Sequence, residues 1–101
     1  MTVRVKICGI TSSEQAQMAQ QQGADALGLV IYEKSPRYVN LEQAAKIRAS
    51  ITSDCLAIVL LVNPSELLVK QVIEQVKPDL IQFHGDETPE FCHQFNFPFI
   101  R

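Results

Sequence analysis

Four apolar runs with the length of β-strands recur along the chain, and a fifth begins near its end. Between them, apolar residues recur three or four positions apart, as they do on one face of a helix. The second and third runs are apolar on consecutive residues, which is typical of parallel strands buried on both faces. The pattern predicts strands over residues 3–7, 26–32, 56–62 and 80–83, with a fifth beginning within 97–100.

Each segment between these runs begins with a residue that commonly caps the N-terminus of a helix. The first is the strongest, because Thr11 and Glu14 have the spacing of a capping box. In the third, Pro64 suits the first helical turn. The predicted caps are Thr11, Asn40, Asn63 and Thr88.

Strands that alternate with helices predict an α/β fold with a parallel sheet. The chain has 101 residues, whereas a complete (βα)8 TIM barrel needs roughly 200 or more. A domain seldom stops one step into an apolar segment, because an exposed strand edge invites association. We therefore expect residues 1–101 to form the N-terminal half of such a barrel, a single incomplete domain with four βα units and the start of strand five. A complete, small doubly wound sheet is the alternative.

The composition is that of a soluble globular chain, with 47% hydrophobic residues, 20% charged residues and a net charge of −2. This balance argues against a nucleic-acid partner and against an anionic membrane surface. The longest apolar run, residues 55–62, is too short to span a bilayer. The first residues carry charges and do not resemble a signal peptide. We therefore expect a cytoplasmic protein.

The three cysteines, Cys8, Cys55 and Cys92, form an odd number at wide spacing. This pattern fits neither a disulfide framework nor a CxxC metal site, and it favours a reducing compartment. The sequence also lacks a glycine-rich phosphate loop and a Ser-His-Asp order. No spacing typical of a metal site appears anywhere in the sequence.

Polar clusters follow three of the predicted strands. Cys8 ends the first strand and is followed by a glycine and a helix start, where a thiolate would be stabilised as a base or nucleophile. Arg37 lies in the loop after the second strand and could hold a carboxylate or phosphate bidentately. His84 follows the fourth strand and could act as acid, base or hydrogen-bond donor. The carboxyl ends of parallel strands converge on one crevice, so we expect these groups to share a site.

Each of these residues also has an ordinary structural interpretation. Cys8 could be a small buried hydrophobe, as many free cysteines are, and Arg37 could be a solvated surface charge. His84 could be a loop histidine that bonds to Asp86 or Glu87, and those two acids could equally be solvated charges before the last helix.

Three motifs in register together resemble phosphoribosylanthranilate isomerase of tryptophan biosynthesis. They are KICGIT at 6–11, GADALGLVIYEKSPRYV at 23–39 and QFHGDE at 82–87. The resemblance implies a (βα)8 barrel isomerase that carries out an Amadori rearrangement without a cofactor. Its substrate would be a phosphosugar-anthranilate, N-(5-phosphoribosyl)anthranilate. It further implies that Cys8 is the general base, that Arg37 faces the anthranilate end of the substrate and that His84 lines the pocket.

The same resemblance implies that a catalytic aspartate and glycine-rich phosphate loops belong to the second half of the barrel. We therefore expect this chain to be a fragment that lacks the general acid and the phosphate site. Two other hypotheses stay open. One is a non-catalytic half-barrel that pairs with a complementary half, or self-associates, through exposed strand edges. The other is a thiol-dependent redox or sensor protein, which the absence of a resolving cysteine near Cys8 disfavours.

Overall fold

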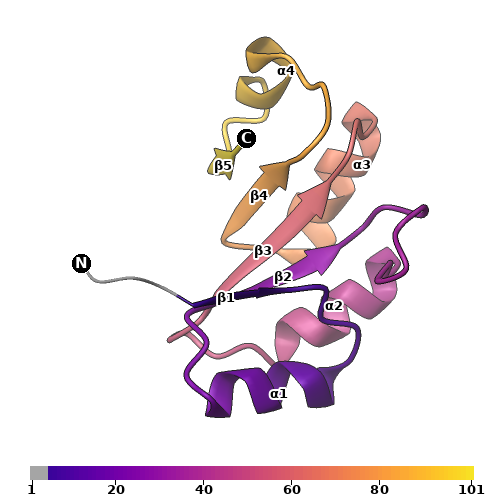
Figure 1. The fold of residues 1–101 in the computed structure, drawn as a ribbon. Helices are drawn as coiled ribbons and strands as arrows, with labels where there is room; N and C mark the ends of the chain where they lie inside the picture. The colour runs from indigo at the N-terminus through magenta and orange to yellow at the C-terminus, as the bar shows by residue number, and fades with distance from the viewer. Residues whose placement is uncertain (1–4) are drawn as a thin grey trace.

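The structure is a computed structural model that describes residues 5–101. Its five strands form one parallel sheet in the order β1-β2-β3-β4-β5 (Figure 1). The strands are β1 (Lys6–Cys8), β2 (Ala26–Val30), β3 (Leu56–Leu61), β4 (Leu80–Phe83) and β5 (Phe99–Ile100). The helices are α1 (Ser13–Gln21), α2 (Leu41–Ala49), α3 (Glu66–Gln71), its π-helical continuation η1 (Val72–Val76), and α4 (Pro89–His93).

The strand order distinguishes between the two predicted architectures. A doubly wound sheet reverses its strand order at a switch point and carries helices on both faces. Here the order follows the chain without reversal, and α1, α2 and α3 lie on the same side of the sheet (Figure 1). The doubly wound alternative is therefore wrong, and the described residues have the strand order of a (βα)8 barrel.

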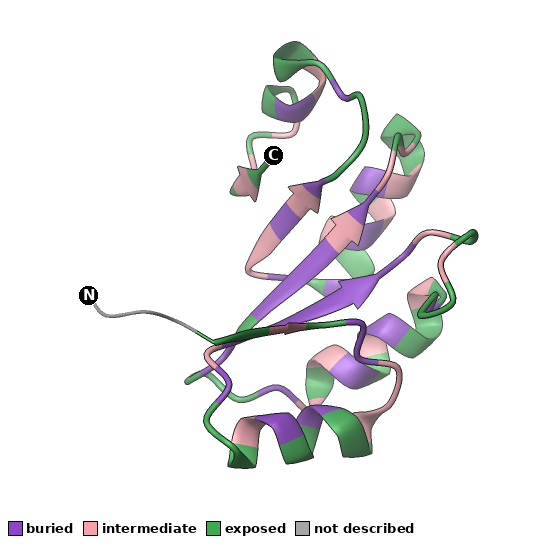
Figure 2. Ribbon diagram, in the orientation of Figure 1, coloured by how far each residue is buried: buried purple, intermediate pink, exposed green. Residues whose placement is uncertain are grey.

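The sheet has two unlike faces. One face packs under the helices, and the alternate strand residues Leu27, Leu29, Val59, Leu61, Ile81 and Phe83 belong to that hydrophobic core. Ala26, Val30 and Ile58 are also buried, but they lie outside this core cluster and point to the opposite face. Figure 2 shows β2 buried along its whole length and β3 along most of it.

Two of the predicted helix caps are shifted along the chain. The Ser12 hydroxyl, not that of Thr11, accepts the hydrogen bond from Gln15 N in the first turn of α1, at 3.1 Å. The side chain of Gln15 instead accepts from the Thr11 backbone amide and hydroxyl. Ser65, not Asn63, caps α3 by accepting from Leu68 N at 3.0 Å.

The other two caps are confirmed. Asn40 forms a complete capping box. Its side chain accepts a hydrogen bond from Gln43 N at 2.8 Å, and its backbone N–H donates to Gln43 Oε1 at 3.0 Å. Thr88 accepts from Phe91 N at 3.1 Å, with Pro89 in the first turn of α4. Strand bounds differ slightly from the predicted ones: β1 extends to Cys8, β2 ends at Val30, and residues 3 and 4 lie outside the described part of the chain.

Two aspartates tie the amino ends of neighbouring strands together. Asp25, which precedes β2, accepts a hydrogen bond from Val5 N at 2.9 Å through its carboxylate. Asp79, which precedes β4, accepts from Ala57 N at 2.8 Å in the same way. In both cases the backbone N–H of the aspartate returns a hydrogen bond to the carbonyl of its partner, at 2.8 Å. The unit β3-α3-β4 therefore repeats the closure of β1-α1-β2.

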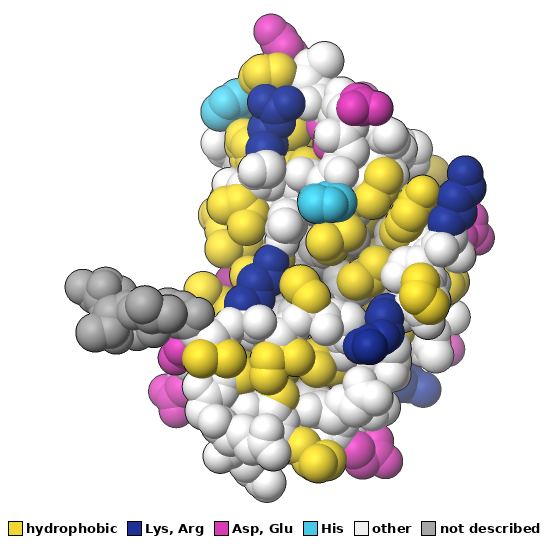
Figure 3. All heavy atoms as spheres, in the orientation of Figure 1, with side chains coloured by type: hydrophobic (Ala, Val, Ile, Leu, Met, Phe, Trp, Pro, Cys, Tyr) yellow, Lys and Arg dark blue, Asp and Glu magenta, His cyan; other side chains and the backbone are white. Residues whose placement is uncertain are grey.

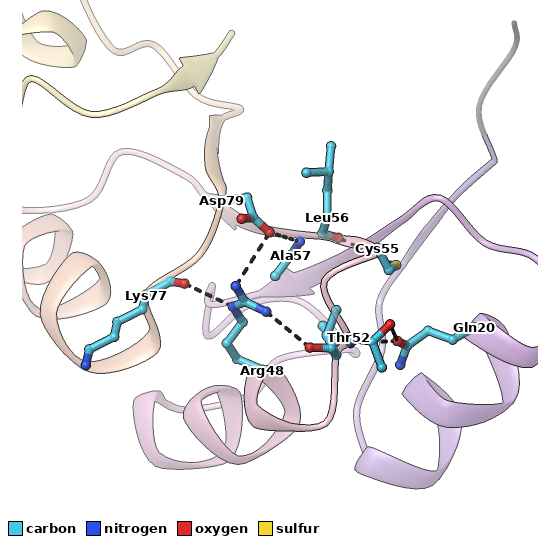
Figure 4. Close-up of polar contacts among 9 residues, drawn as sticks. Gln20, Arg48, Thr52, Cys55, Leu56, Ala57, Lys77 and Asp79 are labelled. Atoms are coloured by element: carbon cyan, nitrogen blue, oxygen red, sulfur yellow. Dashed lines mark hydrogen bonds and ion pairs between the residues drawn. The ribbon is translucent and has the colours of Figure 1, made fainter.

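Arg48 of α2 reinforces the second of these closures (Figure 4). Its guanidinium lies 3.6 Å from the Asp79 carboxylate and donates to Lys77 O at 3.0 Å. Close by, Gln20 of α1 accepts from the backbone amide of Thr52 at 2.9 Å. These contacts fix the helices at the end of the sheet opposite to the strand ends where the polar clusters lie.

We predict that Asp79→Ala lowers the free energy of unfolding by about 1–3 kcal/mol, because it leaves the Ala57 amide without its acceptor. Asp79→Asn keeps a carbonyl acceptor and should cost less. Urea denaturation followed by circular dichroism measures both, and Asp54→Ala, at an exposed aspartate before β3, is the matched control. Equal effects of the Asp54 and Asp79 changes would contradict this role.

Candidate functional site

The three predicted site residues lie at the carboxyl edge of the sheet. Cys8 is the last residue of β1, Arg37 lies in the loop between β2 and α2, and His84 directly follows β4. Cys8, Arg37 and His84 are all exposed. The interpretation of Cys8 as a buried hydrophobe is therefore wrong.

Gly28 makes room for the thiol. It pairs with Cys8 in the parallel register of β1 and β2, and a Cβ at position 28 would lie 2.7 Å from Cys8 Sγ. Real Cβ atoms essentially never approach another heavy atom so closely. The absence of a side chain at Gly28 thus determines where the Cys8 thiol lies. The sequence pattern of β2 gave no reason to select Gly28. Its importance comes from its register with Cys8 on the neighbouring strand, which the sequence of β2 alone does not show.

Gly9 joins Cys8 to Arg37. Its backbone has a positive φ of 82°, which side-chain-bearing residues seldom adopt, and its amide donates to Gly28 O at 3.0 Å. The Arg37 side chain lies across it, since a Cβ on Gly9 would be 3.0 Å from Arg37 Nη1. Arg37 Nη1 also donates to Gly9 O at 3.3 Å. The guanidinium therefore contacts the residue next to the thiol and is not a freely solvated charge.

The loop that carries Arg37 is held by its own hydrogen bonds. Ser35 Oγ accepts from Arg37 N at 3.1 Å, and Ser35 O accepts from Tyr38 N at 3.1 Å. Val39 N then returns to Val30 O, at the end of β2, at 2.9 Å. The loop thus closes on the strand it left and presents Arg37 toward β1.

Glu87 ties the loop after β4 to the loop after β3. Its buried carboxylate accepts from Asn63 N at 2.8 Å and from Gly85 N at 2.9 Å. Asn63 reciprocates, because its Oδ1 accepts from Asp86 N at 2.7 Å. The interpretation of Glu87 as a solvated charge is therefore wrong, and its carboxylate bonds to backbone amides instead of to His84.

This pair of loops places His84 at the site. The backbone amide of His84 donates to Leu61 O at 2.9 Å, which continues the pairing of β4 with β3 by one residue. Gly85 follows in close contact with Asn63, and a Cβ on Gly85 would lie 2.6 Å from Asn63 Oδ1. Asn63 was predicted to be a helix cap, and its distant partners at 85–87 could not be predicted from local spacing.

The other two cysteines are buried in the core. Burial raises the pKa of the Cys55 thiol, and the nearby Asp25 and Asp79 carboxylates raise it further, although Arg48 opposes them. Burial likewise raises the pKa of the Cys92 thiol, against the opposing effect of Arg101. Both thiols are protonated at neutral pH and do not belong to the site.

Two hollows lie near the carboxyl edge. One of about 270 Å³ is lined by Cys8, Gly9 and Arg37 together with residues of α1. A larger one of about 660 Å³ lies between the loops that follow β2 and β3 and includes Lys34 and Asn63, but not Cys8, Arg37 or His84. We place the candidate site at the smaller hollow and the adjoining uncovered face of the sheet, because Cys8 and Arg37 line that hollow. Figure 3 shows that on the visible side apolar side chains are interspersed with Lys, Arg and His.

Between residues 5 and 101, no helix is long and apolar enough to cross a membrane. In the same part of the chain, no three His, Cys, Asp or Glu side chains are grouped so that they could hold a metal ion.

We predict that Gly28→Ala destabilises the protein by about 1–3 kcal/mol through overpacking against Cys8 Sγ. The loss should shrink in a Cys8→Ala background, because the clashing sulfur is gone. A double-mutant cycle of chemical denaturation measures this coupling. An equal loss in both backgrounds would show that the strain arises elsewhere.

The buried thiols predict a loss of stability at alkaline pH. Their folded-state pKa values lie above the ordinary 9.0, so the unfolded state releases protons first as the pH rises. This contribution to stability is complete below pH 9 and is lost as the pH rises through the raised values. Urea midpoints between pH 8 and pH 11 should fall less steeply in the Cys55→Ala, Cys92→Ala double variant than in the wild type. Parallel pH profiles would contradict this linkage.

Comparison with known proteins agrees with the family resemblance of the motifs at 6–11, 23–39 and 82–87. Residues 5–101 match the model of the N-(5'phosphoribosyl)anthranilate (PRA) isomerase family. The N-(5'-phosphoribosyl)anthranilate isomerase of Legionella pneumophila (strain Lens) is 46% identical over 99 residues, which are 98% of this chain and 48% of that protein. The enzyme of the same name from Alcanivorax borkumensis is 49% identical over 102 residues, covering 100% of this chain and 47% of its own length.

Solved structures give the same relationship. A phosphoribosyl anthranilate isomerase in complex with reduced 1-(o-carboxyphenylamino)-1-deoxyribulose 5-phosphate superposes with a TM-score of 0.92 at 35% identity, over 97% of this chain and 52% of that one. The Thermotoga maritima enzyme superposes with a TM-score of 0.89 at 37% identity, over 94% of this chain and 46% of its own. The chain thus spans about half the length of the relatives it matches. With its motifs, strand order and matched residues in agreement, it belongs to the phosphoribosylanthranilate isomerase family.

Proposed function

We propose that this chain supplies the proton-abstracting part of an active site that isomerises N-(5-phosphoribosyl)anthranilate in tryptophan biosynthesis. The product is 1-(2-carboxyphenylamino)-1-deoxyribulose 5-phosphate. The observation that carries the proposal is the contact of Arg37 with Gly9, which brings a cation to the residue that follows Cys8 at the carboxyl edge of the sheet. A relative whose structure holds the reduced form of this product supports the choice of substrate.

The chemistry needs an acid, a base and no net oxidation. Protonation of the ribose ring oxygen breaks its bond to C1′ and leaves an iminium ion. The Cys8 thiolate then takes the C2′ proton, and that electron pair forms the C1′–C2′ double bond of an enolamine while the iminium is neutralised. Reprotonation at C1′ with loss of the enol proton gives the ketone, so the atoms balance as an isomerisation.

Arg37 and His84 take binding roles in this proposal. The planar guanidinium of Arg37 matches the carboxylate of the anthranilate group. Since it contacts the residue next to Cys8, the carboxylate would be held close to the reacting carbon. We assign His84, held at the end of β4, to the same crevice, where its imidazole would donate a hydrogen bond to the substrate.

The general acid and the phosphate site are assigned to no residue of this chain. Phosphate sites of (βα)8 barrels typically follow strands seven and eight, whereas the described residues contain five strands. We therefore propose that residues 1–101 act as the N-terminal half of a barrel in the cytoplasm, and that turnover needs a complementary half.

A second candidate function is assembly through the open sheet edges. β1 and β5 are the outermost strands, and Val5, Leu56 and Ile100 expose 52%, 46% and 42% of their surface near these edges and on the uncovered face. Apolar side chains beside an unpaired strand edge favour pairing with another chain. A half-barrel that pairs with a complementary half, or with its own copy, is consistent with this surface.

The test is loss of anthranilate fluorescence when the chain meets the substrate, alone and mixed with the remaining half of the Legionella relative. We expect the mixture to turn over, Cys8→Ala to abolish turnover while substrate still binds, and Arg37→Ala mainly to raise KM. Turnover by the Cys8→Ala mixture would refute the base assignment. Sedimentation of the same samples tests the second candidate function. That function predicts that the complex forms with or without Cys8 and that it does not turn over the substrate.

A further inference from the structure

Lys6 and Gln82 form a contact across the uncovered face of the sheet. Lys6 is the first residue of β1 and Gln82 lies in β4. The Lys6 ammonium donates a hydrogen bond to Gln82 Oε1. Neither residue was selected from the sequence, because 76 positions separate them.

The contact runs diagonally from β1 to β4, because Lys6 is in register with Ala26 and Leu56, whereas Gln82 is in register with Leu60. Since β2 and β3 lie between β1 and β4, and neighbouring strands are about 4.8 Å apart, the two backbones are three strand intervals apart along the sheet. Two side chains meet over that span because the sheet curls toward its uncovered face. The contact is therefore a direct expression of the curvature.

The residues beneath the crossing are buried although no helix covers them. Ala26, the register partner of Lys6, is 6% exposed, and Ile58 in β3 is 4% exposed. Both lie outside the core cluster under the helices. The curl of the sheet and the Lys6–Gln82 contact above it are consistent with this burial.

The crossing lies directly below the candidate site. Side chains two residues apart on a strand share a face, so Lys6 shares its face with Cys8. Gln82 shares its face with His84, because the His84 amide continues the strand pairing to Leu61 O at 2.9 Å. Both steps run in the same direction because the strands are parallel. Each member of the contact therefore lies two residues before a site residue on the same face, Lys6 before Cys8 on β1 and Gln82 before His84 at the end of β4.

We propose that Lys6 and Gln82 are positioning residues that hold β1 and β4 at the spacing where Cys8 and His84 face one ligand. That the spacing serves a ligand rests on the proposed function. That Lys6 and Gln82 hold the spacing does not. Lysine suits the role because its long, flexible stem carries the ammonium away from β1 toward Gln82. Glutamine suits it because a neutral amide accepts the hydrogen bond without a charge of its own.

The neutral partner has an electrostatic consequence. The ion pairs within residues 5–101 are Arg48–Asp79 and Lys70–Glu66. In this part of the chain neither Lys6 nor Arg37 is therefore neutralised by a carboxylate. Both cations belong to the uncovered side of the sheet or its carboxyl edge, which suits a ligand that carries a carboxylate and a phosphate.

The experiment measures the distance between the two site residues without requiring turnover. A nitroxide attached to Cys8, the exposed cysteine, broadens nearby proton resonances, and the buried Cys55 and Cys92 stay unlabelled. The readout is the broadening of the His84 ring protons, which depends on the inverse sixth power of distance. Gln82→Asn shortens the side chain by one methylene, Gln82→Glu keeps its length, and Lys70→Met is the control for loss of an exposed lysine.

We expect strong broadening of His84 in the wild type, in Gln82→Glu and in Lys70→Met. Lys6→Met and Gln82→Asn should lose most of it while amide spectra show that they remain folded. Unchanged broadening in Gln82→Asn, or equal loss in Gln82→Glu, would overturn the proposal. If Lys6→Met does not fold, the two Gln82 variants decide alone. Failure of the proposed function would appear separately, as turnover by the Cys8→Ala mixture, and the broadening measured with Cys8 labelled does not depend on that result.

Discussion

The pairing of β1 with β2 determines where the thiol of Cys8 lies. β1 is a three-residue strand at the edge of the sheet, and such a strand contributes little stability by itself. It is fixed below by the exchange of hydrogen bonds between Val5 and Asp25, and above by the Gly9 amide on Gly28 O. The missing side chain at Gly28 then leaves one space for the sulfur. The same turn at Gly9 supports the guanidinium of Arg37, so one strand pair carries both groups.

The opposite side of the site depends on a buried carboxylate. Glu87 accepts from two backbone amides in two different loops, which makes the loops after β3 and β4 one unit. A buried carboxylate is stable only when its hydrogen bonds are made, so the unit is held as a whole. Arg101 closes it from the far side by donating to Glu87 O at 2.7 Å. His84 is thereby positioned by contacts in which its own imidazole takes no part.

Local patterns in the sequence were sufficient for the strands and for the edge at which the site lies. Strand ends of a parallel sheet share an edge whatever the side chains, so Cys8, Arg37 and His84 could be placed there before any coordinates. Caps were less certain, because Thr11 and Ser12 are equally good acceptors and the position of the Gln15 side chain decides between them. Gly28 and the Lys6–Gln82 contact were not predictable, since both depend on which residues of separate strands come into register.

The two aspartate closures and the cross-sheet contact differ in the length of chain that each must close. Asp25 and Asp79 meet their partners over 20 and 22 positions, whereas Lys6 and Gln82 meet over 76. Loop-closure entropy makes the long closure less favourable by about 1 kcal/mol. On loop-closure entropy alone, the βαβ closures are therefore easier to form than the contact across the curled sheet. The separation of Cys8 from His84 therefore depends on the least favourable of these closures, whereas the place of each residue at its own strand end depends only on the short ones.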